Sequence, residues 1–388
     1  MFSGRTRFDL RPNRLAAALE AKRAAGVRLL DLTESNPTRA GFVAPADVLE
    51  SLADPAGRLY EPVAQGLLLA REAVSRDYAR RGHAVPPERI LLTAGTSEAY
   101  AFLFKLLCDP GDEVLVPRPG YPLFDYLAGL ESVVTRSYTL AYDGEWHLDL
   151  PALRGAITPL TRAVVVVSPA NPTGQYLKSH ELSGLVELCA ERDLALVSDE
   201  VFADYAWSED PRRVTSVAGD GPALAFSLGG LSKSCGLPQL KLAWIAVGGP
   251  GAKRAEAQAR LEIVADTFLS VSTPVQVAAP TLLRRLPELQ AGIRARLAGN
   301  REALAEALGG NSPVSMLASE GGWYAVLQVP ATLSEEETTL RLLERHDVLV
   351  HPGYFFDFPR EAFLVLSLLP PSADFAKGVR HVLDGLVS

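Results

Sequence analysis

Ser227-Leu-Gly-Gly-Leu-Ser-Lys-Ser-Cys-Gly-Leu-Pro-Gln-Leu-Lys241 is a connection rich in glycine and serine. Its first lysine, Lys233, lies between the apolar runs 223–228 and 242–247, and both runs are typical of buried strands. A lysine at the edge of a core is partly desolvated, which favours the neutral amine and suits it to Schiff-base chemistry. Taken alone, however, the stretch favours an ordinary loop with a solvated lysine.

Composition limits the classes of function. The chain has 388 residues, 48% of them hydrophobic, and a formal net charge of −8. Its length suggests about two domains, and its acidic balance gives no reason to expect nucleic acid or an anionic membrane as partner. The start of the chain does not resemble a signal peptide, and no apolar run approaches the ~20 residues that span a bilayer. We therefore expect a cytoplasmic protein.

Cysteine and histidine usage gives no sign of a metal centre. The three cysteines and six histidines are scattered along the chain, without the spacing of metal ligands or of a disulfide framework. We expect no metal ion.

Short apolar runs alternate with helical patterns up to Gly249, which is typical of a mostly parallel sheet buried on both faces. The expected strands are 90–93, 113–116, 162–168, 194–198, 223–228 and 242–247. Long helices follow, the first expected over 253–283, with a capping box at Ser334 and few strands. We expect a large domain over 46–285 and a smaller α/β domain made of the N-terminal arm, 1–45, and residues 286–388.

Polar residues follow the ends of these strands, at the edge where open α/β sheets bind ligands. Gly95-Thr-Ser97 opens a helix and suits a phosphate, although it also suits a plain helix cap. Asn171-Pro-Thr-Gly174 is a tight turn, which needs no further role. Asp199 ends a buried strand, where a carboxylate needs a cationic partner, either an arginine or the protonated nitrogen of a ligand.

In this order and spacing, five motifs resemble those of the class I/II aminotransferases. The motifs are Gly95-Thr-Ser97, Pro119-Gly-Tyr-Pro122, Asn171-Pro-Thr-Gly174, Asp199-Glu-Val-Phe202 and Ser232-Lys233…Gly236-Leu-Pro238. The resemblance covers nearly the whole chain. It implies the α/β fold type I of the aspartate-aminotransferase-like enzymes that use pyridoxal 5′-phosphate (PLP), with a mostly parallel seven-stranded sheet in the large domain and a smaller α/β domain.

The resemblance implies roles for single residues. Lys233 would form the Schiff base with PLP and then carry a proton on the substrate. Asp199 would keep the pyridine nitrogen protonated, Asn171 would bond the ring 3-oxygen, and Tyr121 would stack on the ring. The residues that would hold the phosphate are Gly95, Thr96, Ser97, Ser232 and Lys241.

The resemblance also implies a homodimer with its sites at the subunit interface. Tyr60 resembles the tyrosine that reaches the phosphate from the partner subunit. The loop 33–38, with Ser35 and Asn36, would lie over the substrates, which are an amino donor and a keto acid.

Around the cofactor, three positions depart from the family pattern. Phe202 stands where a tyrosine is usual, so the ring 3-oxygen loses a phenol donor, and Tyr205 is a candidate substitute. Lys241 stands where an arginine is usual and offers a point charge in place of a fork. Gly230 stands where a serine is frequent.

The substrate side departs further. Val365 stands where an arginine usually binds the substrate α-carboxylate, and Ser35 where the N-terminal loop usually has glycine. Arg360 and Arg39 are candidate replacements for that arginine, although an arginine on the rim also simply faces solvent. The α-carboxylate is therefore expected to be bound unusually, or the amino donor to lack one.

These features predict a PLP-dependent aminotransferase. The same Lys233, PLP and Asp199 set also serves lyases and decarboxylases, so a PLP-dependent lyase or decarboxylase is the second hypothesis. A non-catalytic PLP-binding sensor is the third, although the chain lacks a basic N-terminal DNA-binding segment. The substrate itself is not readable from the sequence.

Overall fold

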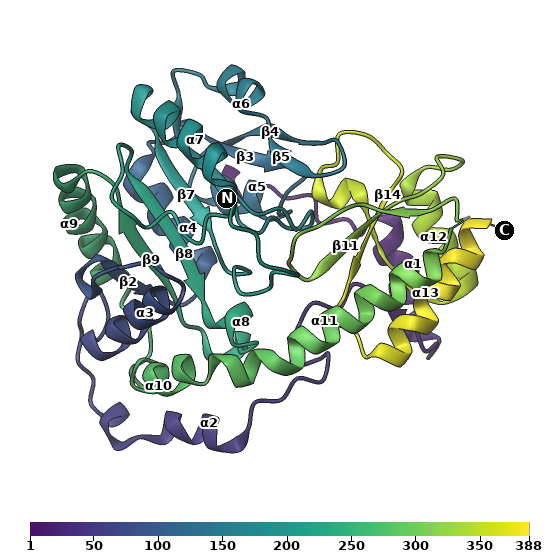
Figure 1. Cartoon of the computed structure of the whole chain (residues 1–388), viewed down its shortest axis with the longest axis horizontal. Coiled ribbons are helices and arrows are strands. Elements are labelled where there is room, and N and C mark those ends of the chain that lie inside the picture. Colours follow the sequence, from purple (N-terminus) through teal and green to yellow (C-terminus); the bar gives the residue numbers. More distant parts are fainter. Residues whose placement is uncertain (311, 388) are drawn as a thin grey trace.

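A long helix, α11 (Leu286–Leu308), links two α/β units in the computed structural model, which describes residues 1–310 and 312–387 (Figure 1). The larger unit is built on an eight-stranded sheet with the order β2-β9-β8-β7-β6-β3-β4-β5. Its strands are β2 (Ile90–Thr93), β3 (Glu113–Arg118), β4 (Val134–Tyr142), β5 (Trp146–Leu148), β6 (Thr161–Val167), β7 (Ala195–Asp199), β8 (Ala225–Gly230) and β9 (Ala243–Gly248).

Most strands of this sheet run in one direction. The pairs β4-β3, β3-β6, β6-β7 and β7-β8 are parallel, whereas β9 is antiparallel to both β8 and β2, and β5 is antiparallel to β4. The predicted mostly parallel sheet is therefore confirmed, with eight strands instead of seven. We predicted neither β4 nor β5. Most residues of β4 are exposed or half-buried, so it lacks a continuous apolar run, and β5 has only three residues.

Alternate residues of the central strands enter different cores. Val197 and Phe226 face one side of the sheet and pack against α4 (Thr96–Leu107), α5 (Phe124–Leu130) and α9 (Gly251–Phe268). Leu196 faces the opposite side, which is covered by α6 (Leu150–Ala156) and α7 (Ser179–Glu191), with α3 (Leu68–Arg80) and α10 (Thr273–Arg284) farther along. Burial on both faces explains the continuous apolar runs of the sequence.

The smaller unit joins the two ends of the chain. Its antiparallel sheet has the order β10-β11-β14-β13, and β1 pairs in parallel with β12 in a separate sheet. These strands are β1 (Leu30–Asp31), β10 (Ser315–Met316), β11 (Tyr324–Gln328), β12 (Val348–Leu349), β13 (His351–Pro352) and β14 (Phe363–Ser367). The helices around them are α1 (Arg14–Ala24), α12 (Glu335–His346), α13 (Ser372–Val387) and α11. Residues from both ends therefore share one core, which includes Leu30 and Leu364.

Two predictions about helices have different outcomes. The capping box at Ser334 is confirmed, because its side chain accepts from the N–H of Glu337 at the start of α12. The single helix expected over 253–283 is wrong: α9 ends at Phe268 and α10 begins at Thr273. Leu269 adopts the left-handed conformation (φ 50°), which ends the helix and which leucine rarely adopts.

Short elements complete the fold. The 3-10 helices of the described residues are Gly4–Thr6, Ser51–Ala53, Pro55–Arg58, Pro87–Arg89, Pro238–Leu240 and Gly353–Phe356. The remaining α-helices are α2 (Ala46–Glu50) and α8 (Leu231–Ser234). Among residues 1–310 and 312–387, no helix has the length and apolarity needed to cross a membrane.

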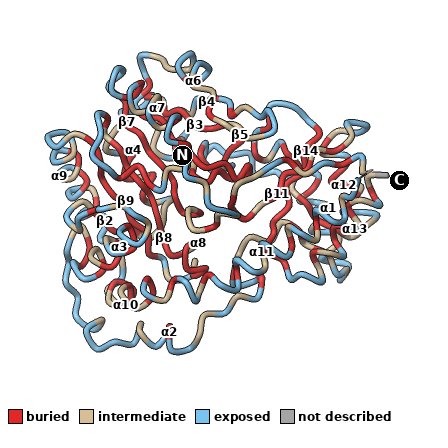
Figure 2. Tube along the Cα trace, viewed as in Figure 1, coloured by how far each residue is buried: buried red, intermediate tan, exposed pale blue. Residues whose placement is uncertain are grey.

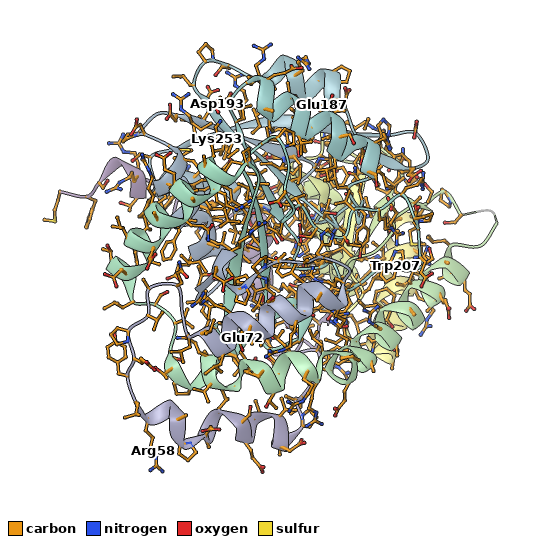
Figure 3. All side chains as sticks on the ribbon, turned by 60° about the vertical axis from the view of Figure 1, so that its left-hand side comes forward. Arg58, Glu72, Glu187, Asp193, Trp207 and Lys253 are labelled. Carbon is orange, nitrogen blue, oxygen red and sulfur yellow. The ribbon has the colours of Figure 1, made fainter. Side chains whose placement is uncertain are left out.

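Burial differs sharply between the sheet and the segment around α2. The central strands are buried, whereas the chain from α2 to α3 runs along the outside and is largely exposed (Figure 2). Arg58 lies at the outer edge of this segment (Figure 3). On the far side of the same unit, Lys253 of α9 forms an ion pair with Asp193, which follows α7 (Figure 3).

Candidate active site

The sheet brings the polar clusters of the sequence to one edge. The strands β3, β6, β7 and β8 are parallel, and β2 runs with them because β9 opposes both β2 and β8. Their carboxyl ends therefore lie at the same edge, and β9 starts there. Following or preceding these ends are Gly95, Tyr121, Asn171, Asp199, Lys233 and Lys241.

Asp199 is a buried carboxylate at the end of β7. The hydroxyl of Tyr100, on α4, donates to its Oδ2 at 3.1 Å, and the N–H of Val201 donates to its Oδ1 at 3.2 Å. Burial raises its pKa from 3.8 to about 6, although these two hydrogen bonds and Lys233 lower it. The site therefore holds the charge of Asp199 at a cost, and a cation beside it would relieve that cost.

Lys233 lies on the short helix α8, just after β8. Its Nζ is 5.1 Å from the ring centroid of Trp323 and 5.7 Å from that of Phe202. Burial lowers its pKa, and the charge of Asp199 opposes this shift. The amine of Lys233 is thus held among aromatic rings, in the partly desolvated state that its sequence context indicated.

Tyr205 does not face the same way as Lys233 Nζ. Its hydroxyl donates to the backbone carbonyl of Lys233 at 2.7 Å, and its ring packs edge-on against Trp323. The hydroxyl of Tyr205 therefore hydrogen-bonds the backbone of α8 and does not supply the phenol that Phe202 lacks.

The start of α4 and Lys241 face one another. A methyl group added to Gly95 would lie 3.4 Å from Lys241 Nζ. Thr96 and Ser97 form the first turn of α4, where backbone N–H groups are free to bind an anion. Lys241 adopts the left-handed conformation (φ 53°) just before β9, and this conformation directs the chain back toward the sheet.

Around Ser232, the structure explains one departure of the sequence. Ser232 lies in the first turn of α8, and Gly230 is the residue just before that helix. A side chain at position 230 would come within 2.9 Å of Ala243 Cβ, on the adjacent strand. Glycine at this position therefore lets β8 and β9 approach closely, and a serine would require them to move apart.

Asn171 and Tyr121 complete the edge. Asn171 is buried, and its Oδ1 has no hydrogen-bond partner within the described residues. A buried amide oxygen without a partner is costly, and a ligand or water that donates a hydrogen bond to it would relieve that cost. The ring of Tyr121 packs edge-on against Phe124 at 5.6 Å. Burial and the charge of Asp199 raise the pKa of Tyr121 to about 12, so its hydroxyl stays protonated at neutral pH.

The loop 33–39 lies against the smaller sheet. Ser367, at the end of β14, donates to the carbonyl of Glu34 at 2.7 Å. Asn36 Oδ1 accepts from the N–H and hydroxyl of Thr38, so this side chain holds the loop in shape. Arg39, a candidate for binding a carboxylate, already forms an ion pair with Glu34 at 3.0 Å. Ser35 lies in the same loop, beside Tyr324, where it lowers the pKa of the phenol against the rise caused by burial.

Val365 lies within β14, whereas Arg360 lies before it. Val365 pairs with Val326 and His351 and is fully buried in an apolar cluster. Arg360 precedes the start of β14 and stacks on Phe363 at 4.9 Å, whereas the Ser35 loop contacts the other end of the strand. The structure therefore does not bring Arg360 together with Ser35 and Asn36.

Tyr60 lies apart from the other predicted residues of its own chain. It belongs to the outer segment, and 69% of its surface is exposed, next to Leu59 at 74%. The described residues also contain no cluster of three histidine, cysteine, aspartate or glutamate side chains that would hold a metal ion.

Two residues of this site were missed from the sequence. Tyr100 belongs to the apolar helix α4, where a tyrosine reads as a core residue. It lies one helical turn after Thr96, so a phosphate-binding helix start could have drawn attention to it. Trp323 is distant in sequence and belongs to the other unit, and the adjacent pair Gly321-Gly322 was the only local signal of a close backbone approach.

Comparison with known proteins identifies the family. The model of the family "Aminotransferase class I and II" matches residues 29–374. The chain is 30% identical to an alanine aminotransferase of Mycobacterium tuberculosis over 96% of this chain and 88% of that protein. It is 29% identical to a glutamate-pyruvate aminotransferase of Escherichia coli K12, over 90% and 89% of the two chains.

Solved structures agree with this. An Escherichia coli aminotransferase superposes with a TM-score of 0.87 at 26% identity, covering 100% of this chain and 98% of that one. Aspartate aminotransferase of Thermus thermophilus, in a single-mutant form, superposes with a TM-score of 0.85 at 25% identity and covers 100% of both chains. The chain therefore belongs to the class I and II aminotransferases, with their fold type I, and is an aminotransferase that uses PLP.

Proposed function

We propose that Lys233 anchors PLP and that Asp199 pairs with its pyridine nitrogen. The observation that carries this proposal is the placement of a desolvated amine and a desolvated carboxylate at the ends of the adjacent strands β8 and β7. The protonated ring nitrogen would supply the cation that ionised Asp199 needs. Asn171, buried at the same edge, would donate from its amide Nδ2 to the 3-oxygen, and Tyr121 would lie on the ring.

The other end of the cofactor fits the start of α4. Gly95, Thr96 and Ser97 offer backbone N–H groups at a helix N-terminus, and Lys241 Nζ lies beside them. Ser232, in the first turn of α8, would add its hydroxyl to the phosphate site. These residues would hold the phosphate through the helix dipole and one point charge.

Once bound, PLP withdraws electrons from the carbon that bears the amino group and so makes its proton removable. The amine of Lys233 would take that proton and return it at the neighbouring position, after which water would cleave the bond to the donor and release it as a keto acid. A second keto acid would then take up the amino group by the same steps in reverse. Burial lowers the pKa of Lys233, which suits this work, because only the neutral amine accepts a proton. Asp199 stays ionised beside the cation and Tyr100 fixes its orientation.

For the substrates, we propose an amino acid as donor and a keto acid as acceptor, with alanine or pyruvate on one side of the exchange. The support comes from relatives named alanine, glutamate-pyruvate and arginine-pyruvate aminotransferases, at about 30% identity. Ser35 and Asn36 would border the substrate from the loop 33–39, and Arg39 would become available to a carboxylate only by leaving Glu34. Arg360 would contribute only from the rim.

We also propose a homodimer in the cytoplasm, with the large domain over 46–285 and the smaller over 1–45 and 286–388. The pairing of β1 with β12 supports the grouping of the N-terminal arm with the C-terminal part. The exposed apolar side chains of Val43, Leu59 and Tyr60 support a partner that covers the outer segment. In such a dimer, Tyr60 would reach the phosphate of the partner's site.

Turnover of the holoenzyme should require both an amino donor and a keto acid. With L-alanine and 2-oxoglutarate, we expect pyruvate and glutamate in equal amounts, because the amino group stays on the enzyme until an acceptor arrives. Chromatography of the products measures both. Release of ammonia and pyruvate without any keto acid would instead indicate a lyase.

Replacing Lys233 with Ala should abolish covalent attachment of PLP and lower turnover by at least about 100-fold, because the amine that anchors PLP and moves the proton is lost. Borohydride reduction followed by peptide mass spectrometry locates the attached lysine. Lys241→Ala is the matched control: it should keep the adduct and bind PLP about 10- to 100-fold more weakly. A reducible adduct in the Lys233→Ala active site would contradict the assignment.

Replacing Asp199 with Asn should stabilise the apoprotein while lowering turnover by at least about 100-fold. Burial raises the pKa of Asp199 to about 6. Ionised Asp199 therefore destabilises the fold above pH 6, and this effect disappears as the pH falls below 3.8. The gain in unfolding free energy should be about 3 kcal/mol at pH 8 and roughly half of that at pH 5. Urea unfolding at both pH values measures it, and an Asn variant less stable than wild type at pH 8 would refute the prediction.

If Tyr60 serves the partner's site, two defective chains should complement one another. A hybrid of Lys233→Ala and Tyr60→Ala chains contains one intact site, so a random mixture should recover about a quarter of wild-type activity at limiting PLP. A mixture of Lys233→Ala with Asp199→Asn is the control, since both residues serve the same chain's site and no intact site forms. Equal activity in the two mixtures would argue against a shared site.

A further inference from the structure

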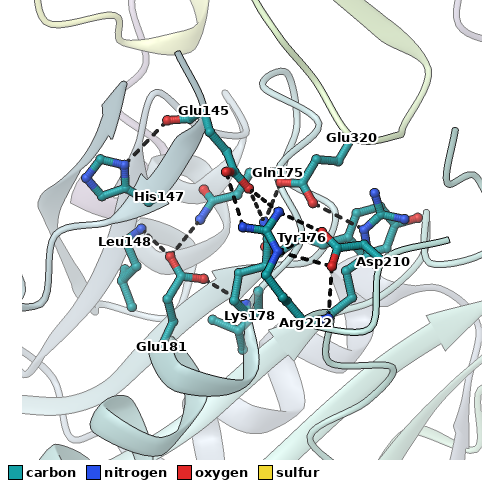
Figure 4. Close-up of polar contacts among 12 residues, drawn as sticks. Glu145, His147, Leu148, Gln175, Tyr176, Lys178, Glu181, Asp210, Arg212 and Glu320 are labelled. Carbon is teal, nitrogen blue, oxygen red and sulfur yellow. Dashed lines mark hydrogen bonds and ion pairs between the residues drawn. The ribbon is translucent and has the colours of Figure 1, made fainter. Parts of the chain in front are cut away.

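A buried trio of charges lies at the junction of the two units. Lys178, just before α7, donates from Nζ to Glu320 Oε1 at 2.5 Å, and Arg213 Nε donates to Oε2 of the same carboxylate at 3.2 Å. The exposed fractions of the side chains are 4% for Lys178, 14% for Glu320 and 10% for Arg213. Figure 4 shows the carboxylate of Glu320, which precedes β11, directed at Lys178.

The cations of this trio are themselves fixed. Lys178 Nζ also donates to the carbonyl of Tyr176 at 3.1 Å and lies 3.3 Å from Glu145 (Figure 4). The guanidinium of Arg213 lies over the ring of Tyr176, 4.6 Å from its centroid. Glu320 therefore meets a rigid, preformed pair of cations, and loss of its charge would leave both of them without this partner.

Backbone hydrogen bonds extend this anchorage toward the candidate active site. The N–H of Glu320 donates to the carbonyl of Gly174, in the turn that begins with Asn171, and the N–H of Gly322 donates to Tyr205. A side chain at Gly321 would come within 2.4 Å of the Tyr205 carbonyl, so the two segments touch through their backbones. The strand β11 begins immediately after Trp323.

Trp323 is the end of this path. It is fully buried and packs edge-on against Phe202 and Tyr205, with ring centroids 5.3 Å and 5.2 Å apart. Its ring centroid lies 5.1 Å from Lys233 Nζ. Only Gly321 and Gly322 separate it from Glu320, and Gly322 has a positive φ of 89°. The bridge between Gly321 and Ala206 and the hydrogen bond from Gly322 to Tyr205 hold this short link in place.

We propose that Lys178, Glu320 and Arg213 are positioning residues, which seat Trp323 against Lys233 and so control the exposure of its amine to water. This inference rests on the proposed role of Lys233 and adds a cause for its desolvation that lies in the other unit. The trio holds the segment 319–323 from one side, and the hydrogen bonds to Gly174 and Tyr205 hold it from the other.

The variant Glu320→Gln tests the proposal. In the apoprotein, trinitrobenzenesulfonate modifies the neutral amine of Lys233, and peptide mass spectrometry measures the extent of modification at each pH. We expect the pH midpoint of this modification to rise in the variant, because a loosened indole admits water that favours the ammonium form. In the holoenzyme, the single-turnover rate with L-alanine should fall by about 10- to 100-fold through misplacement of the amine. Arg213→Gln keeps the bond between Lys178 and Glu320, so it should shift the pH midpoint and the single-turnover rate in the same directions but by less. It replaces Glu320→Gln in both measurements if that variant does not fold.

A double-mutant cycle with Trp323→Phe separates positioning from general damage. If Glu320 acts through the indole, the double variant should shift the Lys233 midpoint no further than Trp323→Phe alone. Additive shifts would overturn the proposal. Glu113→Gln is the matched control: Glu113 is also a largely buried carboxylate, paired with Arg136 at 3.1 Å on the other side of the sheet, and its loss should leave the midpoint unchanged.

The two proposals fail differently. If wild-type holoenzyme does not transfer an amino group, the proposed function fails whatever the variants do. If wild type is active and Glu320→Gln keeps the Lys233 midpoint and the single-turnover rate of wild type, only the positioning role is refuted.

Discussion

The attraction between one buried amine and one buried carboxylate organises the site. Asp199 ends β7 and Lys233 follows the parallel strand β8, and each lies in surroundings that oppose its charge. Neither is neutralised by an ordinary surface ion pair. Both carry unfavourable desolvation, which a cofactor with a protonated nitrogen and a reactive aldehyde would relieve.

The sequence predicts this edge well because the responsible rules are local. Strands buried on both faces produce continuous apolar runs, and parallel strands bring their carboxyl ends together, so Gly95, Asn171, Asp199 and Lys233 could be placed without coordinates. The strand β4 and the break at Leu269 could not be predicted in this way. The first is half-exposed, and the second depends on a left-handed backbone conformation that leucine rarely adopts.

Contacts between distant segments also limited how much of the site could be predicted from the sequence. Tyr205 was a candidate phenol for PLP from its place near Phe202, but its hydroxyl bonds the Lys233 carbonyl. The contribution of Trp323 depends on a close approach of Gly321 to Tyr205, two residues that no sequence pattern connects. Val365 shows the opposite case: its departure from the family pattern was evident in the sequence, and the structure adds that its surroundings are apolar and filled.

The pairing of β1 with β12 has a consequence for biosynthesis. Leu30 and Val348 are adjacent strand partners that come from opposite ends of the chain. During translation, the N-terminal arm leaves the ribosome long before its partner strand exists, whereas the β6, β7 and β8 strands of the larger sheet become available close together in time. The arm must therefore remain unpaired until Val348 and Leu349 have been synthesised, and the pairing then closes a long loop of chain at a cost in conformational entropy.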